Sequence, residues 1–284
     1  MHALAIFLFA LILSISGITL SFARLGSAVL PPNESHGFVG FDRNQYPGDE
    51  ALPILRKSFS FASYWLSPPP SEKTNSWIGK RGVMQAQGFG FLLLYQGRTS
   101  GQLPYKKDSI AAGLADAQAA AAAARREGFP AGSVIFLDVE EGGRFFDGYH
   151  AYLRSWAEAL SREMFRPGIY CSGIVVDEGE GSTIISADDI RAHIGVADVV
   201  YWVYNDACPA SPGCGVPQNP PAPSASGVTY ASVWQYVRSP REKKVARHCR
   251  GYASDGNCYA PGDAAHKWFL DENVASTADP SAPR

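Results

Sequence analysis

Short apolar runs alternate with helix-like segments along most of this chain, and this alternation limits the fold more than any other feature of the sequence. Several runs, such as 90–95 and 134–137, are apolar almost throughout, as in strands that are covered on both faces. Such alternation predicts parallel strands joined by crossover helices, in a closed barrel or a doubly wound sheet. The predicted strands are 38–41, 59–65, 89–95, 133–140, 168–171, 198–203 and 230–237.

The helical segments are clearest in the middle of the chain. Residues 109–127 are dominated by alanine, the strongest helix former. Residues 149–160 carry aromatic and aliphatic side chains at spacings of three and four, which predicts one apolar face packed on the core. Ser186, with Asp189 three residues later, resembles an N-terminal cap before a short helix over 187–194.

Three segments lie outside this alternation. Residues 205–227 and 238–262 are rich in proline or glycine and predict long loops on the barrel. Residues 275–284 lack periodicity and predict a disordered tail. A (β/α)8 TIM-barrel-like domain commonly reaches the size of this 284-residue chain as one unit. We therefore expect a single, irregular α/β barrel over 37–273.

The first residues predict export. An unbroken apolar stretch over 3–13 is followed by small and hydroxylated residues, and Ser21-Phe22-Ala23 offers a cleavage site after residue 23, with a second site after residue 28. The alternative is an uncleaved membrane anchor over 3–20, which is barely long enough to span a bilayer. We expect a periplasmic or extracellular protein, or an N-terminally anchored one.

The cysteines agree with export. Cys208 lies close to Cys214 in the sequence, and Cys249 lies close to Cys258, which favours two local disulfides, although four cysteines allow three connectivities. Neither pair has the two-residue gap of a zinc knuckle. Cys171 remains as a buried, inert thiol within an apolar run.

Charge and histidine usage exclude several classes of function. The formal net charge is −2, and no long basic run could neutralise nucleic-acid phosphates. There is no complete dinucleotide-binding glycine motif. We expect no cofactor, no metal and a monomer. The histidines in the predicted mature chain, which form no metal-type sequence pair, are His36, His150, His193, His248 and His266.

Asp138 and Glu140 are the strongest candidates for chemistry. They lie two residues apart at the end of the predicted strand 133–140, so both side chains project from one face, roughly 6.6 Å apart by the strand rise. The C-terminal ends of barrel strands form the active-site mouth. Glycosidic cleavage needs one acid to protonate the leaving oxygen and a second group to stabilise the developing cation. Glu141 points to the opposite face, where it is better placed to bond a loop or a helix start.

Other strand ends also finish in polar residues. Asp42 follows the first strand, Tyr95 and Gln96 end the third, and Gln235 lies in the last. Asp42 could instead be a turn or cap residue. For Trp234, which precedes Gln235, core packing and an aromatic sugar platform remain alternatives.

These pieces occur in a familiar order. The chain resembles bacterial glycoside-hydrolase-like domains of the Rv2525c-like type, which are relatives of family 25 lysozyme-type muramidases. The resemblance rests on 40–47, 88–97, 136–140, 167–170, 233–236 and 269–271.

The resemblance implies that Glu140 is the general acid and that Asp138 orients or stabilises a substrate N-acetyl group. Asp42 and Asp271 would line the same pocket, although the loop before Asp271 is longer than the resemblance leads us to expect. We therefore expect an exported glycosidase acting on an N-acetylated polysaccharide such as peptidoglycan. The alternative is a catalytically inactive barrel that binds glycan or an envelope partner.

Overall fold

The structure, a computed structural model, describes residues 37–103, 105–244 and 248–284. Eight of its strands form a closed barrel in the order β1-β10-β9-β8-β5-β4-β3-β2. These are β1 (Phe38–Asp42), β2 (Phe61–Trp65), β3 (Gly90–Gln96), β4 (Val134–Asp138), β5 (Arg166–Ser172), β8 (Val200–Tyr204), β9 (Val233–Val237) and β10 (Asp271–Ala275). The predicted TIM-barrel-like fold and all seven predicted strands are confirmed.

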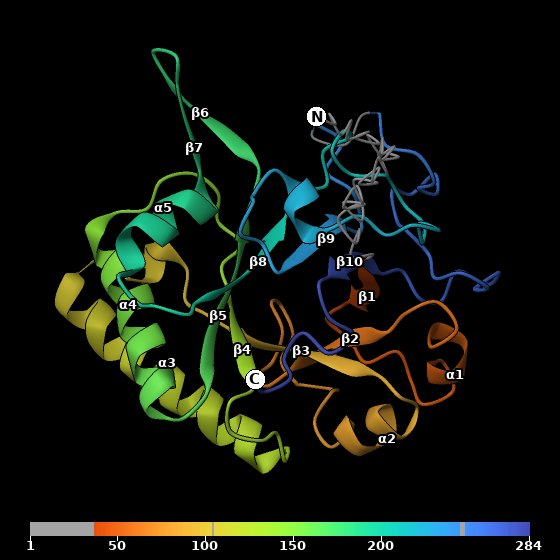
Figure 1. Ribbon diagram of the computed structural model, residues 1–284, viewed down its shortest axis with the longest axis horizontal. Helices are drawn as coiled ribbons and strands as arrows, with labels where there is room; N and C mark the ends of the chain where they lie inside the picture. The colour runs from red at the N-terminus through yellow and green to blue at the C-terminus, as the bar shows by residue number, and fades with distance from the viewer. Residues whose placement is uncertain (1–36, 104, 245–247) are drawn as a thin grey trace, which may run out of the picture. The chain divides into compact units, whose positions relative to one another are not determined.

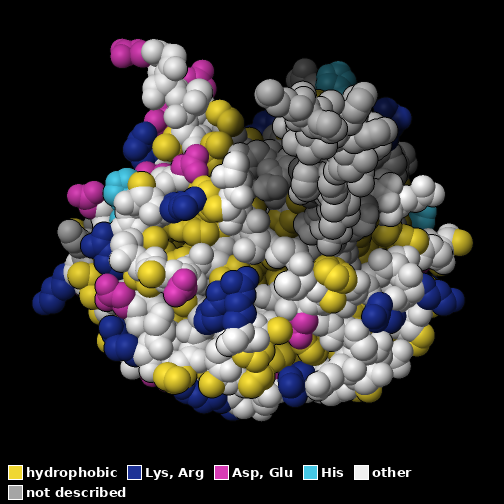
Figure 2. Space-filling model, in the orientation of Figure 1, with side chains coloured by type: hydrophobic (Ala, Val, Ile, Leu, Met, Phe, Trp, Pro, Cys, Tyr) yellow, Lys and Arg dark blue, Asp and Glu magenta, His cyan; other side chains and the backbone are white. Residues whose placement is uncertain are grey.

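The barrel is irregular because its closing strand runs backwards. Strands β1 to β5, β8 and β9 pair in parallel, whereas β10 pairs antiparallel with both β9 and β1. A further hairpin, β6 (Val175–Gly179) and β7 (Ser182–Ile185), was not predicted. It projects from the molecule with acidic side chains gathered at its tip (Figures 1 and 2).

The helices cover the barrel unevenly. Helices α3 (Lys106–Arg126), α4 (Asp147–Arg162) and α5 (Ser186–Ile194) lie on one side, and α1 (Leu52–Leu55) and α2 (Arg81–Ala86) lie on another (Figure 1). Two short 3-10 helices, η1 (Ser100–Gln102) and η2 (Pro223–Ser226), occur in loops. In the part of the chain that the structure describes, no helix has both the length and the hydropathy that a membrane crossing requires.

The predicted cap at Ser186 is wrong. The residue at the N-cap position is Ile185, which makes no side-chain cap bond, and Ser186 already belongs to α5. The Ser186 hydroxyl donates instead to the Gly143 carbonyl. The Asp189 carboxylate bonds to Phe145 and His150 on neighbouring chain segments.

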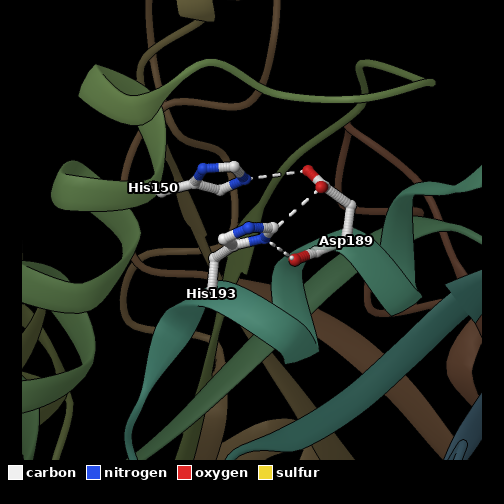
Figure 3. A group of neighbouring side chains, drawn as sticks. All are labelled: His150, Asp189 and His193. Atoms are coloured by element: carbon white, nitrogen blue, oxygen red, sulfur yellow. Dashed lines mark hydrogen bonds and ion pairs between the residues drawn. The ribbon is translucent and has the colours of Figure 1, made fainter.

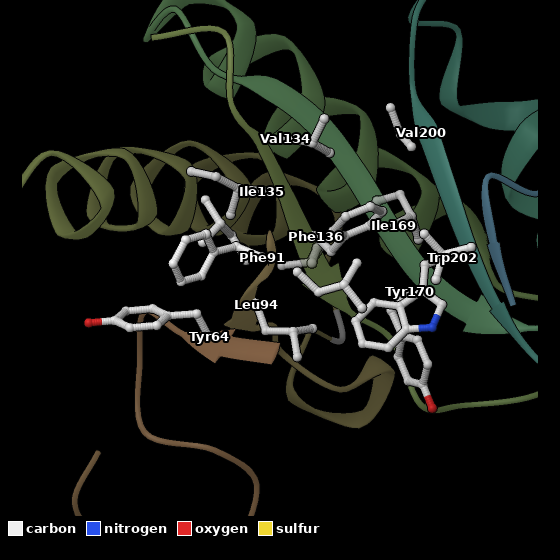
Figure 4. Close-up of a cluster of buried hydrophobic side chains, with 14 of the residues drawn as sticks. Tyr64, Phe91, Leu94, Val134, Ile135, Phe136, Ile169, Tyr170, Val200 and Trp202 are labelled. Carbon is white, nitrogen blue, oxygen red and sulfur yellow. The ribbon is translucent and has the colours of Figure 1, made fainter. Parts of the chain in front are cut away.

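Aromatic rings fill the barrel interior. Phe136 and Trp202 meet edge to face with their ring centroids 5.7 Å apart (Figure 4). Gly168 stands beside Phe136 on the neighbouring strand, where a Cβ atom would overlap the ring. Close packing therefore requires glycine there, and the rings leave the polar residues to the mouth above them.

The predicted disordered tail over 275–284 is wrong. Ala275 ends β10, and the residues after it pack against β3. Leu93 N donates to Ser281 Oγ at 2.9 Å, and Phe91 N donates to Asp279 Oδ1 at 2.9 Å. Ser281 is buried, and the tail satisfies backbone N–H groups of β3.

The disulfides join the two long loops to each other. Cys208 bonds to Cys249, and Cys214 bonds to Cys258, with Cα atoms 5.2 and 5.5 Å apart. The predicted local pairing is therefore wrong, because the loops lie side by side and each supplies one sulfur to each bond. Cys171 is free and buried, as predicted. The predicted signal peptide, over 1–23 or 1–28, lies outside the described residues.

Candidate active site

Four carboxylates gather at the mouth of the barrel. Asp42 and Asp138 are the last residues of β1 and β4, and Glu140, two positions after Asp138, lies close enough to both to influence their ionisation. Asp271 begins β10, and because β10 is antiparallel it pairs with Asp42 at the same rim. The structure thus brings together the four acids that the sequence predicts for the site.

Gln235 bridges two of these acids. Its Nε2 atom lies 2.9 Å from Asp42 Oδ1 and 3.4 Å from Asp271 Oδ2, and its Oε1 atom accepts a 2.7 Å bond from the Tyr170 hydroxyl. Gln235 is only 1% exposed. Its amide is therefore occupied by the protein, so it positions the acids and does not face a substrate directly.

A second amide fixes Asp42 from the neighbouring strand. Asn273 Nδ2 donates to Asp42 Oδ1 at 2.6 Å, while Trp202 Nε1 donates to Asn273 Oδ1 at 2.9 Å. The tryptophan bond sets which way the Asn273 amide faces. Asp42 is consequently a buried, doubly bonded carboxylate and not the turn or cap residue of the alternative interpretation.

Burial raises the pKa of these acids. Burial brings the pKa of Asp42 to about 6, although the bonds from Asn273 and Gln235 oppose the change. Burial, followed by the charges of Glu140 and Asp42, holds the pKa of Asp138 well above its usual value. Because neighbouring carboxylates resist ionising together, the cluster retains protons at a pH where isolated carboxyl groups have lost theirs.

Glu140 differs from Asp138 in its access to solvent. The Glu140 residue is exposed at the mouth, whereas Asp138 is 8% exposed. The protein atoms around Glu140 still raise its pKa, and the charge of Arg238 opposes that increase. Glu140 is therefore the member of the pair that can exchange a proton with a bound molecule.

Arg238 places a positive charge beside the acids of the site. Its guanidinium lies 2.9 Å from the fully buried Asp206 carboxylate and 4.5 Å from the centre of the Tyr204 ring. The Tyr204 hydroxyl donates in turn to the Glu140 backbone carbonyl at 2.7 Å. Arg238 also lowers the pKa of Asp271 against the effect of burial. These contacts connect β8, β9 and the segment after β4 around one fixed positive charge.

Two hollows meet at Glu140. The larger, of about 420 Å³, is also lined by Asp271, Arg43 and Phe269. The smaller, of about 110 Å³, lies between Glu140 and Asp138. Binding sites for small molecules usually measure about 300–1,000 Å³. Only the larger hollow falls in that range, so the smaller one fits a substituent of a ligand better than a whole ring.

Four residues predicted for substrate contact line neither hollow: Asp42, Tyr95, Trp234 and Gln235. Tyr95 stacks on Trp156 of α4 at 5.7 Å, so it faces the helical layer. Trp234 is fully buried and donates to the Asn205 carbonyl. Of the two alternatives for this residue, core packing is therefore correct and an aromatic sugar platform is not. The Tyr95 and Trp234 side chains point outward because residues alternate along a strand, and their neighbours Gln96 and Gln235 point inward.

Glu141 bonds a loop, as predicted. Its two oxygens accept bonds of 2.7 and 2.9 Å from the Ser100 backbone and hydroxyl at the start of η1. Glu141 also lines the smaller hollow, but its carboxylate is held by the protein. The adjacent carboxylates therefore have different roles: Glu140 opens onto both hollows, whereas the Glu141 carboxylate is bonded to Ser100.

Sequence reasoning missed Arg238, Tyr170 and Asn273. Arg238 directly follows β9, so the rule that marked the other strand ends could have found it. Tyr170 and Asn273 carry no comparable signal, because their roles depend on the side chains opposite them. Among the described residues, imidazole and carboxylate atoms that could share a metal ion belong to His150, Asp189 and His193 on α4 and α5, outside both hollows.

Comparisons with known proteins agree with the fold. A family model described as "Rv2525c-like, glycoside hydrolase-like domain" matches residues 71–215. No curated protein matches the sequence. A solved structure of an uncharacterized B. stearothermophilus protein is 21% identical, with a TM-score of 0.52 over 84% of this chain and 96% of that one.

Two further solved structures share the fold. The Mycobacterium tuberculosis Tat-secreted protein Rv2525c, in complex with L-tartrate, is 14% identical, with a TM-score of 0.51 over 84% of this chain and 95% of that one. The Clostridium perfringens spore cortex lytic enzyme SleM is 12% identical, with a TM-score of 0.51 over 85% of this chain and 68% of that one.

Proposed function

Because the chain belongs to the family of Rv2525c-like, glycoside hydrolase-like domains, we propose that it is an exported glycosidase that cleaves an N-acetylated cell-wall glycan such as peptidoglycan. One observation carries the proposal. Asp138 and Glu140 form a pair of carboxyl groups with raised pKa values, and only Glu140 opens onto a hollow large enough for a sugar.

In this proposal Glu140 is the general acid. The pair holds a proton that Glu140 delivers to the glycosidic oxygen as the bond to the anomeric carbon breaks. The leaving sugar departs as an alcohol. Burial of Asp138 favours retention of that proton near neutral pH, since two adjacent carboxylates in a site of low polarity are unfavourable.

The nucleophile would come from the substrate. The acetamido oxygen of the sugar attacks the anomeric carbon and forms a cyclic oxazolinium ion, which water then opens while Glu140 accepts a proton. The sugar ring would occupy the 420 Å³ hollow and its acetamido group the 110 Å³ hollow beside Asp138. Asp138 would accept the amide N–H and stabilise the developing positive charge.

The two disulfides support export, because such bonds persist mainly in oxidising compartments. The apolar stretch over 3–13 supports an export signal. Mass measurement of the N-terminus of protein recovered from outside the cytoplasm tests cleavage after residue 23 or 28 against a retained anchor.

The experiment that tests turnover measures reducing ends released from purified peptidoglycan. Glu140→Gln is expected to lower the rate about 10²–10⁴-fold, the usual effect of losing a general acid, while Glu158→Gln on the exposed face of α4 retains it. Chemically de-N-acetylated peptidoglycan should be cleaved much more slowly if the acetamido group is the nucleophile.

Two outcomes would count against the proposal. In the first, the wild-type protein releases no reducing ends from any wall preparation but binds glycan as tightly as Glu140→Gln does. That result would show that the protein is a catalytically inactive glycan-binding barrel. Equal rates on acetylated and de-N-acetylated glycan would exclude the acetamido mechanism and the proposed role of Asp138.

A further inference from the structure

A cluster of two histidines and one aspartate lies between α4 and α5, away from the acidic site. Figure 3 shows the His150 and His193 rings stacked on one another with the Asp189 carboxylate beside them. The ring centroids are 4.0 Å apart. The two histidines are far apart in the sequence, and the fold brings them together although they form no metal-type sequence pair.

The ligand-type atoms of these residues already lie close together. His150 Nε2 lies 2.8 Å from Asp189 Oδ2, and His193 Nδ1 lies 3.4 Å from Asp189 Oδ1. One such atom from each residue lies within 4.8 Å of the other two. Ligands of a tetrahedral zinc ion are separated by about 3.3 Å, given bond lengths of about 2.0–2.1 Å. Small movements of the side chains would reach that geometry.

Asp189 carries an oxygen that the fold leaves without a hydrogen bond. Its side chain is fully buried, and Oδ2 accepts the Phe145 backbone N–H at 2.9 Å, but Oδ1 has no hydrogen-bond partner. The Arg144 guanidinium approaches Oδ1 only to 3.7 Å and bonds Glu178 instead. A buried carboxylate oxygen without a bonded partner is unfavourable, and a cation beside it would remove that cost.

We propose that His150, Asp189 and His193 form a binding site for a divalent zinc-like ion. Two imidazole nitrogens and one carboxylate oxygen are the ligand set that suits Zn²⁺, with water as the fourth ligand on the open side. Asp189 Oδ1 would bind the ion while Oδ2 keeps its bond to Phe145, as is usual for ligating carboxylates. His150 Nε2 would exchange its contact with Oδ2 for the metal.

His193 supplies the necessary freedom. In the stacked arrangement the two rings are nearly parallel, at 14°, so their nitrogen lone pairs do not yet converge. The His193 side chain is 45% exposed, and its rotation would break the 2.8 Å contact between its Nδ1 atom and the Asp189 backbone carbonyl, whereas His150 is held within α4 at 9% exposure. Binding therefore requires a rotation of the exposed ring and leaves the helices in place.

The ion would tie the two helices to the segment that follows Glu140. That segment is already attached to α5, through Phe145 to Asp189 and through the Gly143 carbonyl to the Ser186 hydroxyl. A bound ion would reinforce these attachments. Its expected effect is on stability, independently of whether Glu140 catalyses glycan cleavage.

Zinc binding is tested on chelator-treated, desalted full-length protein by calorimetric titration with ZnCl₂ at about pH 7.5, where imidazole is neutral. We expect about one ion per chain, a Tm increase of several degrees, and no increase with MgCl₂, because Mg²⁺ prefers oxygen ligands. His193→Ala should weaken binding at least ~10-fold. The matched control His266→Ala, an exposed histidine elsewhere, should bind as the wild type does.

Asp189→Asn tests the carboxylate separately and should also lose binding while retaining an acceptor for Phe145. The proposal is overturned if the wild-type protein binds no zinc at free zinc concentrations up to about 100 times the Kd of an ordinary micromolar site. It is equally overturned if His193→Ala and His266→Ala bind zinc with the same affinity, which would place the ion elsewhere.

Discussion

Gln235 and Asp42 are joined by a 2.9 Å hydrogen bond across the mouth of the barrel, from β9 to β1. The bond supplies an N–H donor to a buried carboxylate whose pKa burial has raised to about 6. The same glutamine accepts from Tyr170, so one side chain satisfies groups on three strands. Removing its donor while keeping its shape is the most direct test of how the acidic cluster is held together.

Gln235→Glu should destabilise the fold by about 2–4 kcal/mol at pH 7, since it replaces a donor with another buried acid. The introduced carboxyl would have a raised pKa in the fold, so the loss of unfolding free energy should grow as pH rises and be smallest near pH 4. Urea denaturation at both pH values measures it. The exposed Gln118→Glu is the control, and a loss independent of pH would contradict this account.

Arg238→Gln should cost about 3–5 kcal/mol of unfolding free energy, because it leaves the buried Asp206 carboxylate without its partner at 2.9 Å. Combining it with Asp206→Asn should recover most of that loss. Replacing the exposed partner Arg162, 3.9 Å from Glu158, should change the free energy by less than about 1 kcal/mol.

The Arg238→Gln/Asp206→Asn protein also tests the electrostatics of the site. Arg238 opposes the upward shift in the pKa of Glu140, so its loss should raise that pKa further. At Asp271 the loss of the Asp206 charge opposes the effect of losing Arg238. If Glu140 acts as the acid, the basic limb of the pH–rate profile should move to higher pH. An unchanged limb would show that another group controls it.

Glu272→Gln should stabilise the protein at alkaline pH. Glu272 is fully buried, and burial raises its pKa to about 7, against the bond that the Gly215 backbone donates. The folded-state pKa exceeds the unfolded value, so the penalty of ionisation begins above about pH 4.5 and is complete above pH 7.

For that variant we expect a gain in unfolding free energy of about 2–3 kcal/mol at pH 8 and less than about 1 kcal/mol at pH 5, by the linkage between pKa and stability. The oxygen of the introduced amide would still accept the bond from the Gly215 backbone. Glu50→Gln, at an exposed position, serves as the control. Equal gains at both pH values would indicate improved packing and not a removed charge.

Cys208→Ser/Cys249→Ser should lower the unfolding free energy by about 3 kcal/mol, because the intact Cys214–Cys258 bond shortens the loop that this bond closes to about 15 residues. Removing the second bond as well should cost more, about 4 kcal/mol, because it then closes its full 44-residue separation. Mass analysis of peptides from unreduced protein checks the pairing itself. Recovery of a Cys208–Cys214 bond would contradict the structure.

The strands and the acidic cluster were predictable because they follow local rules. Apolar runs that are covered on both faces identified the barrel, and the meeting of strand ends at one rim identified Asp42, Asp138 and Glu140. Tyr95 and Trp234 were considered for substrate contact because the alternation of side chains between the two faces of a strand was not applied at those two positions. Each is one residue from an inward-facing glutamine.

The remaining features depend on contacts between distant segments. Closeness in sequence suggested local disulfides, but the pairing follows from two loops that lie against each other only in the folded chain. Strand β10 was not predicted because it begins with the polar residues Asp-Glu-Asn. In the fold, Gln235, Gly215 and Trp202 donate hydrogen bonds to these side chains. The stacking of His150 on His193 likewise has no local signal.

The antiparallel β10 has a consequence for how this chain is made. It closes the barrel against β1, and the bond from Asn273 to Asp42 spans 231 positions. A polypeptide emerging from a ribosome or a translocation channel cannot close its sheet until that last strand is released. The sheet must therefore remain open, with unpaired edges, until β10 has emerged, when barrel closure and assembly of the acidic site occur together.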